Sequence, residues 1–514
     1  MDNLPHLPHR RFPLSRAARR WRLLVAVLAL ALGALSVVML ERARLGIEIT
    51  PMEIGPTQAT LYRAEGVAVA PLVVVAHGFG GSRQMMEAIS LTLARAGMAV
   101  VSFDFHGQGR SPLPMSPDAF PNEQGSSGTT AQLVRQTLQV MDAAEALPGI
   151  RGPAALVGHS MATDIIVRAS GQRALAGPVA LISAYSRQIT PKEPERLLIL
   201  SGEREGRLRE VALEALHQLD PSALEGQTVR EGPVERRVVA SPWVGHVGVL
   251  WSPTSLRELR DWLAGGNGAS EVPVAATGPW ILLLLTSVVA LVWPVSALLP
   301  NRKRAAPKVG VGFFLLLLGA PALPAALASL GFGESLLGFA GFGRIALFFG
   351  VWGGVQLAVL AHYRGLDARI DLPALLLLLA SAGLYVLAMD RYGAAFVATG
   401  PRLGLTAVLA LGTVPFMLGH VHLARGARFW RRALLAVVPL LALGGAMAAA
   451  PQKLGLSFTV APVFLLFLLV FGLMGRWIGR RSGPGTVGLG LGLVLAWAIA
   501  ATTPLFGAAS RLVY

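Results

Sequence analysis

The apolar positions of this chain fall into long runs. Leu23–Leu40 is one such run near the N-terminus, and others follow one another closely over residues 271–514. A helix that crosses a bilayer needs about 20 mostly apolar residues. The pattern therefore predicts a transmembrane anchor at 23–40 and a membrane domain of about eight transmembrane helices over 271–514. The eight predicted spans are 277–299, 309–331, 344–363, 372–389, 403–423, 433–450, 457–475 and 486–507.

The run at 23–40 has a second interpretation, as the apolar core of a cleaved signal peptide. It is longer than the usual core of such a peptide, and Glu41, Arg42 and Arg44 follow it directly. We favour an uncleaved anchor. Either interpretation leaves the next segment on the same side of the membrane.

Residues 41–270 show a different pattern, in which short β-branched runs alternate with helical stretches. The predicted strands are 71–76, 98–103, 154–157, 178–183, 197–200 and 237–240, and the predicted helices lie near 83–96, 129–147, 161–170, 206–219 and 253–264. Such alternation predicts a mostly parallel sheet with helices on both faces. The fold class is therefore α/β for this segment, with an all-α membrane domain after it. Functional groups in such sheets gather at the carboxyl ends of the strands.

Composition agrees with this division. The chain has 514 residues, of which 53% are hydrophobic and 14% charged. This excludes a disordered chain and argues against a wholly soluble protein. The sequence contains no cysteine, which excludes disulfides, thiolate metal sites and cysteine nucleophiles.

The net charge of +16 is unevenly distributed. Residues 41–270 hold 21 basic and 23 acidic residues, whereas 271–514 hold 18 basic and five acidic ones. The excess thus lies in short loops between apolar runs, which argues against a nucleic-acid partner and is typical of a membrane protein. We take 1–22 as a basic cytoplasmic N-terminus and let the spans cross the membrane in alternating directions. This arrangement places 13 of the 18 basic residues of 271–514 in cytoplasmic loops. Residues 41–270 are then extracytoplasmic, and we expect the periplasm of a bacterium.

The sequence Gly158-His159-Ser160-Met161-Ala162 stands between a predicted strand and a predicted helix. A serine on such a sharp turn exposes its hydroxyl at the helix N-terminus. Small residues flank it because strand and helix approach closely there. The fifth position is Ala where the usual pattern has Gly.

Three further groups follow predicted strands. His77-Gly78-Phe79-Gly80-Gly81 is a Gly-rich turn whose N–H groups can face an oxyanion. Gly202-Glu203-Arg204-Glu205 offers a carboxylate, and Gly245-His246 a base. The order of serine, acid and histidine along the chain is that of an α/β-hydrolase.

Together with Asp104–Ser111, which reads DFHGQGRS, these motifs resemble the α/β-hydrolase superfamily. The resemblance is greatest to its lysophospholipase, monoglyceride-lipase and serine-aminopeptidase branch, and it covers roughly 45–265. It implies Ser160 as nucleophile, His246 as general base and Glu205 as the acid, with Glu203 as the competing candidate. It also implies no metal and no organic cofactor. The implied oxyanion hole consists of the N–H groups of Phe79 and Met161, and the implied supporting residues are His77, Gly78, Gly158 and His159.

The expected function is that of a membrane-embedded serine hydrolase, of the esterase or lipase kind, acting on a lipid or other acyl ester. Only residues 184–196 separate two predicted strands where this superfamily often has a helical lid. The pocket is therefore open, or covered by the loop 111–128 or by the membrane domain. An acyl transferase or peptidase using the same triad, and a transport or lipid-handling protein with an accessory hydrolase-like domain, remain alternatives. The sequence gives no expectation of the oligomeric state.

Overall fold

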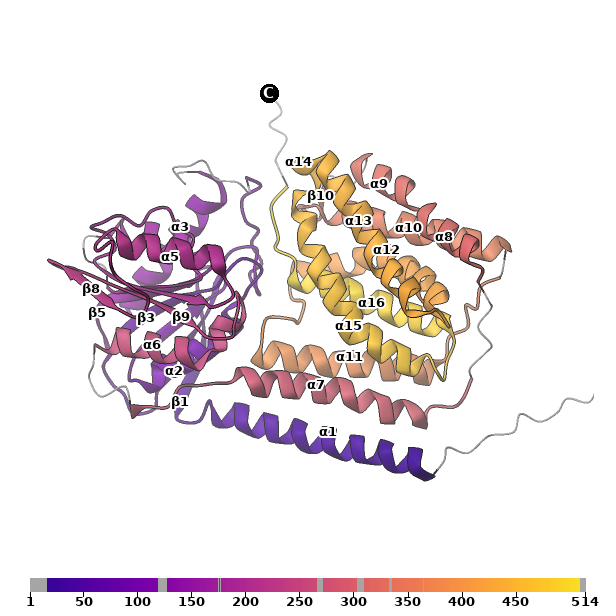
Figure 1. The fold of residues 1–514 in the computed structure, drawn as a ribbon, viewed down its shortest axis with the longest axis horizontal. Helices are drawn as coiled ribbons and strands as arrows, with labels where there is room; N and C mark the ends of the chain where they lie inside the picture. The colour runs from indigo at the N-terminus through magenta and orange to yellow at the C-terminus, as the bar shows by residue number, and fades with distance from the viewer. Residues whose placement is uncertain are drawn as a thin grey trace, which may run out of the picture.

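The structure is a computed structural model. It describes residues 16–118, 127–173, 175, 177–265, 271–302, 309–331, 335–363 and 365–508. Parts of the predicted N-terminal segment 1–22 and of the predicted loop wall 111–128 lie outside these residues, at 1–15 and 119–126. Figure 1 shows an α/β part and a helical part side by side.

The α/β part is built on one sheet with the strand order β1-β2-β4-β3-β5-β6-β7-β9-β8. Its strands are β1 Ile47–Ile54, β2 Thr57–Ala64, β3 Ala70–Ala76, β4 Ala99–Phe103, β5 Ile150–His159, β6 Val179–Ile182, β7 Arg196–Gly202, β8 Thr228–Glu231 and β9 Val234–Ser241. The six neighbouring strands β4, β3, β5, β6, β7 and β9 are parallel, as predicted. The antiparallel strands β1, β2 and β8 were not predicted, and β1 and β8 form the two edges of the sheet.

Five longer helices cover the two faces of the sheet. They are α2 Glu87–Arg95, α3 Gly128–Glu145, α4 Met161–Ser170, α5 Gly206–His217 and α6 Pro253–Ala264. In Figure 1, α3 and α5 lie on one side of the sheet, and α2 and α6 on the other. All five predicted helices are present.

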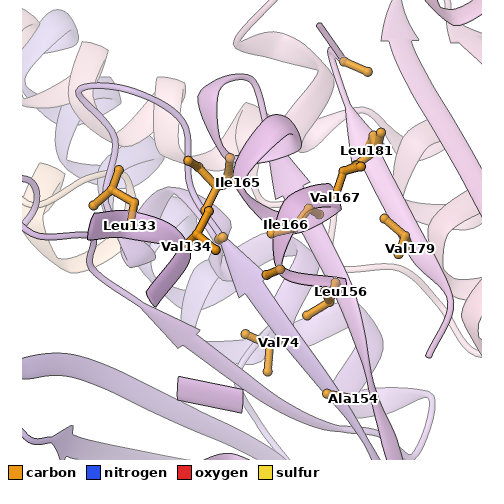
Figure 2. Close-up of a cluster of buried hydrophobic side chains, with 14 of the residues drawn as sticks. Val74, Leu133, Val134, Ala154, Leu156, Ile165, Ile166, Val167, Val179 and Leu181 are labelled. Carbon is orange, nitrogen blue, oxygen red and sulfur yellow. The ribbon is translucent and has the colours of Figure 1, made fainter. Parts of the chain in front are cut away.

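Alternate side chains of the central strands feed two separate cores, because successive residues of a strand point to opposite faces. Val74 packs with residues of α3 and α4, including Leu133 and Ile165 (Figure 2). Its neighbours Val73 and Val75 pack with residues of α2 and α6. Strands buried on both faces explain the continuous apolar runs in the sequence.

Over the residues that the structure describes, the helical part contains ten apolar helices, besides the short helix α14 Pro451–Leu454 and the paired strands β10 Ser335–Leu336 and β11 Phe339–Ala340. The ten are α1 Arg16–Arg42, α7 Gly278–Val295, α8 Val311–Gly319, α9 Ala322–Gly331, α10 Phe342–Tyr363, α11 Leu372–Tyr392, α12 Pro401–Ala424, α13 Phe429–Ala449, α15 Val460–Ile478 and α16 Pro484–Thr502. Within the described residues, nine segments are long and apolar enough to cross a membrane, with α8 and α9 counted as one. Each of the nine coincides with a predicted span.

Two details differ from the predicted spans. The segment 311–331 is interrupted between α8 and α9 at Ala320 and Pro321, because proline does not continue a regular helix. The last helix ends at Thr502 and not at 507, and Pro504 follows it. The residues after it pair with both parts of the molecule, Phe506 with Met115 of the α/β part and Gly507 with Phe339 of the helical part.

Successive long helices alternate in direction, so each has one end at the α/β part. Tyr392 at the end of α11 donates a hydrogen bond of 2.7 Å to Glu41 near the end of α1. Arg402 at the start of α12 donates one of 3.0 Å to the carbonyl of Gly107 in the α/β part. In Figure 1, α1, α7 and α11 run side by side from the α/β part to the opposite end of the bundle.

Glycines allow the central helix α12 to lie close to its neighbours. A Cβ at Gly353 of α10 would overlap the backbone of Pro415 and Phe416, and one at Gly412 would overlap the carbonyl of Ala346. Small residues at helix crossings allow such close packing in membranes.

We expect Gly353→Leu to destabilise the bundle by at least about 1–3 kcal/mol, because the side chain has no room at the crossing. Gly354→Leu is the matched control, since a Cβ at this adjacent position meets nothing within 4 Å. The intrinsic helix propensity changes equally in both variants. Thermal unfolding of the full-length protein in detergent measures the difference, and equal melting temperatures would contradict the close crossing.

Candidate active site

Ser160 lies on a strained turn at the end of β5. Its φ of 52° and ψ of −117° are rare for a residue with a side chain, and α4 begins at the next residue. A Cβ at Gly158 would come within 2.8 Å of Ile166, and one at Gly78 within 3.0 Å of the Ser160 Cβ. Both glycines are therefore needed for the turn that exposes the serine hydroxyl.

Ser160, His246 and Glu205 form a continuous hydrogen-bonded chain. The Ser160 Oγ lies 2.9 Å from His246 Nε2, and His246 Nδ1 lies 2.6 Å from Glu205 Oε1. A carboxylate only accepts, so Nδ1 carries the proton and Nε2 is left to accept from the serine hydroxyl. These three residues come from the carboxyl ends of β5, β7 and β9.

Glu203 lies elsewhere. Its carboxylate accepts a hydrogen bond of 2.7 Å from the backbone N–H of Trp243, and its side chain is exposed. The geometry therefore brings Glu205, and not Glu203, to the histidine.

The Glu205 carboxylate is held in its charged form. Burial opposes ionisation, but hydrogen bonds from His246, the Gly202 N–H and the Ser183 hydroxyl outweigh it and lower the pKa of this carboxyl. The Gly202 and Ser183 bonds measure 2.6 and 2.8 Å and both end on Oε2, which leaves Oε1 for the histidine. A carboxylate with a lowered pKa keeps orienting the imidazole at mildly acidic pH.

Two backbone N–H groups beside Ser160 are available to a ligand. Among the described residues, neither Phe79 nor Met161 donates its N–H to a protein acceptor. Met161 is the first residue of α4, where N–H groups have no partner within the helix. The loop of Phe79 is fixed by a 2.6 Å bond from the Gly80 N–H to Gln108 and a 3.0 Å bond from Gly81 to Gly78.

His77 and His159 act as structural hydrogen-bonding groups. His77 Nδ1 donates to the carbonyl of Gly78 at 2.8 Å, and its Nε2 accepts from the Phe105 N–H at 3.1 Å, so it joins the loops after β3 and β4. His159 Nε2 donates to the carbonyl of His246 at 2.8 Å. Burial lowers the pKa of His77, and that of His159 to about 4, so both are neutral at pH 7.

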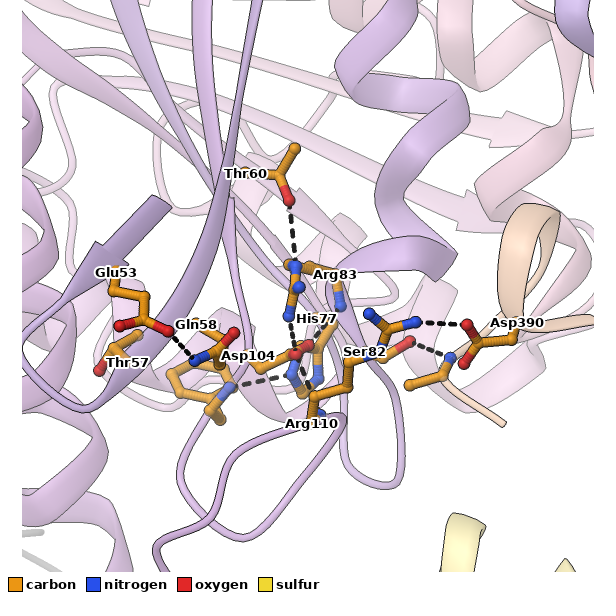
Figure 3. A network of polar contacts seen from close by, with 12 residues as sticks. Glu53, Thr57, Gln58, Thr60, His77, Ser82, Arg83, Asp104, Arg110 and Asp390 are labelled. Carbon is orange, nitrogen blue, oxygen red and sulfur yellow. Dashed lines mark hydrogen bonds and ion pairs between the residues drawn. The ribbon is translucent and has the colours of Figure 1, made fainter. Parts of the chain in front are cut away.

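Asp104 joins two loops and does not contact the triad. The carboxylate accepts hydrogen bonds from the backbone N–H groups of Arg83 and Arg110, at 2.8 and 3.0 Å. It also forms a buried ion pair with the Arg83 guanidinium, which in turn bonds Thr60 (Figure 3). Among the described residues, no three His, Asp or Glu side chains form a metal site.

The helical part contacts the same loops. The Phe79 ring stacks on Phe458, in the segment before α15, with ring centroids 6.1 Å apart, and it lies 6.3 Å from the ring of Phe506. Ser82 accepts a 2.9 Å hydrogen bond from the Ala395 N–H, and Arg110 forms an ion pair with Asp390 (Figure 3). The sequence suggested the membrane half as a cover, but no motif identified these contact residues.

Residues 68–201 match the sequence model of the family described as serine aminopeptidase, S33. This chain carries an α/β-hydrolase domain. The match covers the Gly-rich loop and the Ser160 turn, and the strand order agrees with the expected fold. The comparison with curated proteins finds no match.

The hydrolase domain is also similar to solved structures. A dienelactone hydrolase from Anabaena variabilis is 15% identical with a TM-score of 0.32, over 43% of this chain and 96% of that one. A membrane phospholipase A, described as a bacterial virulence factor, is 15% identical with a TM-score of 0.33, over 49% and 96%. A hormone-sensitive lipase from a metagenome library is 13% identical with a TM-score of 0.31, over 48% and 97%.

The two neighbouring glutamates offer a matched test of the site. We expect Glu205→Gln to slow the reaction of the protein with a fluorophosphonate by about 10³–10⁴-fold, because the amide no longer fixes the imidazole tautomer. Glu203→Gln should change the rate by no more than about twofold, as for other exposed positions. Equal effects of the two substitutions, measured as second-order labelling rates, would contradict the assignment.

Proposed function

We propose that this protein is a membrane-embedded serine hydrolase that cleaves the acyl ester of a lipid. The Ser160 hydroxyl attacks the ester carbonyl while His246 takes its proton. The oxyanion then accepts hydrogen bonds from the N–H groups of Phe79 and Met161. His246 gives the proton to the leaving alkoxide, and the acyl group remains on Ser160.

Water completes the reaction. His246 takes a proton from water, the resulting hydroxide attacks the acyl-enzyme, and the proton returns to the Ser160 oxygen as the carboxylic acid leaves. Glu205 remains ionised throughout and stabilises the charged imidazolium. Every proton is accounted for by Ser160, His246, the leaving alkoxide and one water.

The observation that carries the lipid assignment is the aromatic contact between Phe79 and the helical half. Phe79 supplies an N–H to the proposed oxyanion hole, and its ring lies against Phe458 and Phe506. The residues Phe79 and Phe458 remain 37% and 52% exposed. The acyl chain attached to the ester carbonyl can therefore extend along an apolar surface toward the helices. The connection over residues 183–195 contains no helix that could cover the site from the other side.

The distribution of basic residues supports an extracytoplasmic hydrolase domain. The helix ends opposite this domain carry most of the arginines. Among the described residues these are Arg16, Arg19, Arg20, Arg22, Arg302, Arg369, Arg425, Arg428, Arg431, Arg432, Arg476, Arg480 and Arg481. By the positive-inside rule that end faces the cytoplasm, and the Ser160 site opens near the outer bilayer surface.

If Phe458 lines the acyl path, Phe458→Ala should lower kcat/KM for a palmitoyl ester by about tenfold. The reason is that the transition state would lose ~1.4 kcal/mol of apolar contact with the acyl chain. Hydrolysis of the matching butyrate ester should stay within about twofold, since a short chain does not reach the helices. Steady-state hydrolysis by the full-length protein in mixed micelles measures both.

Two variants complete this experiment. Leu469→Ala removes a side chain of α15 that is 67% exposed on the outside of the bundle, and it should leave both substrates unaffected. Ser160→Ala supplies the blank. Ester hydrolysis that persists in Ser160→Ala would contradict the serine mechanism, and an unchanged palmitoyl preference in Phe458→Ala would contradict the membrane-facing acyl path.

A further inference from the structure

A cavity of about 450 Å³ lies between four helices at the end of the bundle that faces away from the hydrolase domain. Its walls come from the C-terminal ends of α12 and α15 and the N-terminal ends of α13 and α16. Apolar residues such as Met417, Ala436, Leu468 and Leu491 form most of its lining. It is thus separate from the Ser160 site.

Glycines in the last turns of α15 and directly after it leave the space open. Gly472, Gly475 and Gly479 all line the cavity and replace side chains that would fill it. A Cβ at Gly475 would already meet Leu491 at 2.9 Å, whereas one at Gly472 makes only ordinary contact with Leu468. The cavity is therefore wide at Gly472 and narrow at Gly475.

Three arginines stand among the lining residues. Arg425 lies 3.9 Å from Asp367, in an ion pair at the limit of contact. Arg432 and Arg476 have no hydrogen-bond or salt-bridge acceptor within the described part of the chain. Their charges are close enough to interact with each other and with Arg480. An anion beside the apolar cavity would stabilise the like charges of Arg432 and Arg476, which have no acidic partner among the described residues.

His420 adds a polar group inside the cavity. Its ring belongs to α12 and lies near Phe416, with centroids 6.1 Å apart. Among the described residues no protein group forms a hydrogen bond with it, although it is only partly exposed. A ligand group that enters the cavity can therefore bond this imidazole.

We propose that this cavity binds a lipid with an anionic headgroup. The headgroup would lie at Arg425, Arg432 and Arg476, and the acyl chains would occupy the apolar space beside Gly472. Basic pockets between transmembrane helices suit such headgroups. With the proposed orientation, the site takes lipid from the cytoplasmic leaflet. It does not depend on hydrolysis at Ser160, so the two proposals can fail separately.

Native mass spectrometry of the detergent-purified full-length chain tests this site. Ser160→Ala serves as background, so that no lipid is consumed at the other site. With equal amounts of dioleoyl phosphatidylglycerol and dioleoyl phosphatidylcholine, the parent should retain the anionic lipid preferentially. Arg432→Gln combined with Arg476→Gln should weaken that preference by about 25-fold, roughly fivefold for each arginine near the membrane surface.

Arg480→Gln is the matched control, because Arg480 also lacks an acceptor in the described residues but does not line the cavity. It should leave the preference within about twofold of the parent. An equal loss in Arg480→Gln and in the double variant would reduce the effect to general surface charge and overturn the proposal. Equal retention of both lipids by the parent would also overturn it.

Filling the cavity gives a second, charge-neutral test. Gly472→Phe should expel the anionic lipid, whereas Gly444→Phe should not, because Gly444 of α13 faces open space outside the cavity. The melting temperatures of both variants show whether they are folded. Undiminished lipid binding in a folded Gly472→Phe protein would contradict the proposed position of the acyl chains.

Discussion

A buried guanidinium joins the two halves of this molecule. Arg402 at the start of α12 is only 2% exposed, and it donates hydrogen bonds to the carbonyls of Ala500, Thr503 and Gly107. The first two acceptors lie at the C-terminal end of α16, where the helix dipole favours a cation. The third lies in the hydrolase domain. Because a buried charge is costly unless it is hydrogen-bonded, the bond to Gly107 favours contact between this loop of the hydrolase domain and the bundle.

The geometry of the proposed active site follows from that contact. Gly107 also accepts a 2.7 Å bond from the Leu505 N–H, and the next residue, Gln108, holds the Gly80 N–H. The bundle is thus linked to the loop of Gly80 through the Gly107 carbonyl and the Gln108 side chain, and the same loop presents Phe79 to Phe458. The strained Ser160 turn packs closely against Gly158 and Gly78, where a Cβ would have no room. The helical half is therefore a structural part of the proposed site.

Much of this architecture could be predicted from the sequence. Fully buried parallel strands appear as continuous apolar runs of a few residues, and helices long enough to cross a bilayer appear as apolar runs of about 20 residues. Both kinds of run therefore predicted the central strands and the long helices. The edge strands β1 and β8 were missed because at least half of the residues of each face solvent, and IEITPMEI shows only the weaker alternation of such a strand. The order of serine, acid and histidine also suggested which loops meet.

The choice between Glu203 and Glu205 needed coordinates. The two glutamates are only two residues apart in one loop, and the conformation of that loop decides which carboxylate faces the histidine. The contacts of Phe458 and Arg402 with the hydrolase domain could not be predicted either. A lone phenylalanine or arginine near the end of an apolar run has the same appearance in the sequence whether it faces lipid, headgroups or protein. Only the packing of the two halves distinguishes these environments.

The central claim is that an activated Ser160 stands at the outer bilayer surface, against the membrane half. A charged fluorophosphonate that cannot cross membranes tests it most directly, applied to intact spheroplasts that contain the wild-type protein or Ser160→Ala. The account predicts labelling of the wild type in intact spheroplasts and no labelling of the variant. Labelling that requires permeabilisation would contradict the orientation, and labelling that persists in Ser160→Ala would contradict the nucleophile.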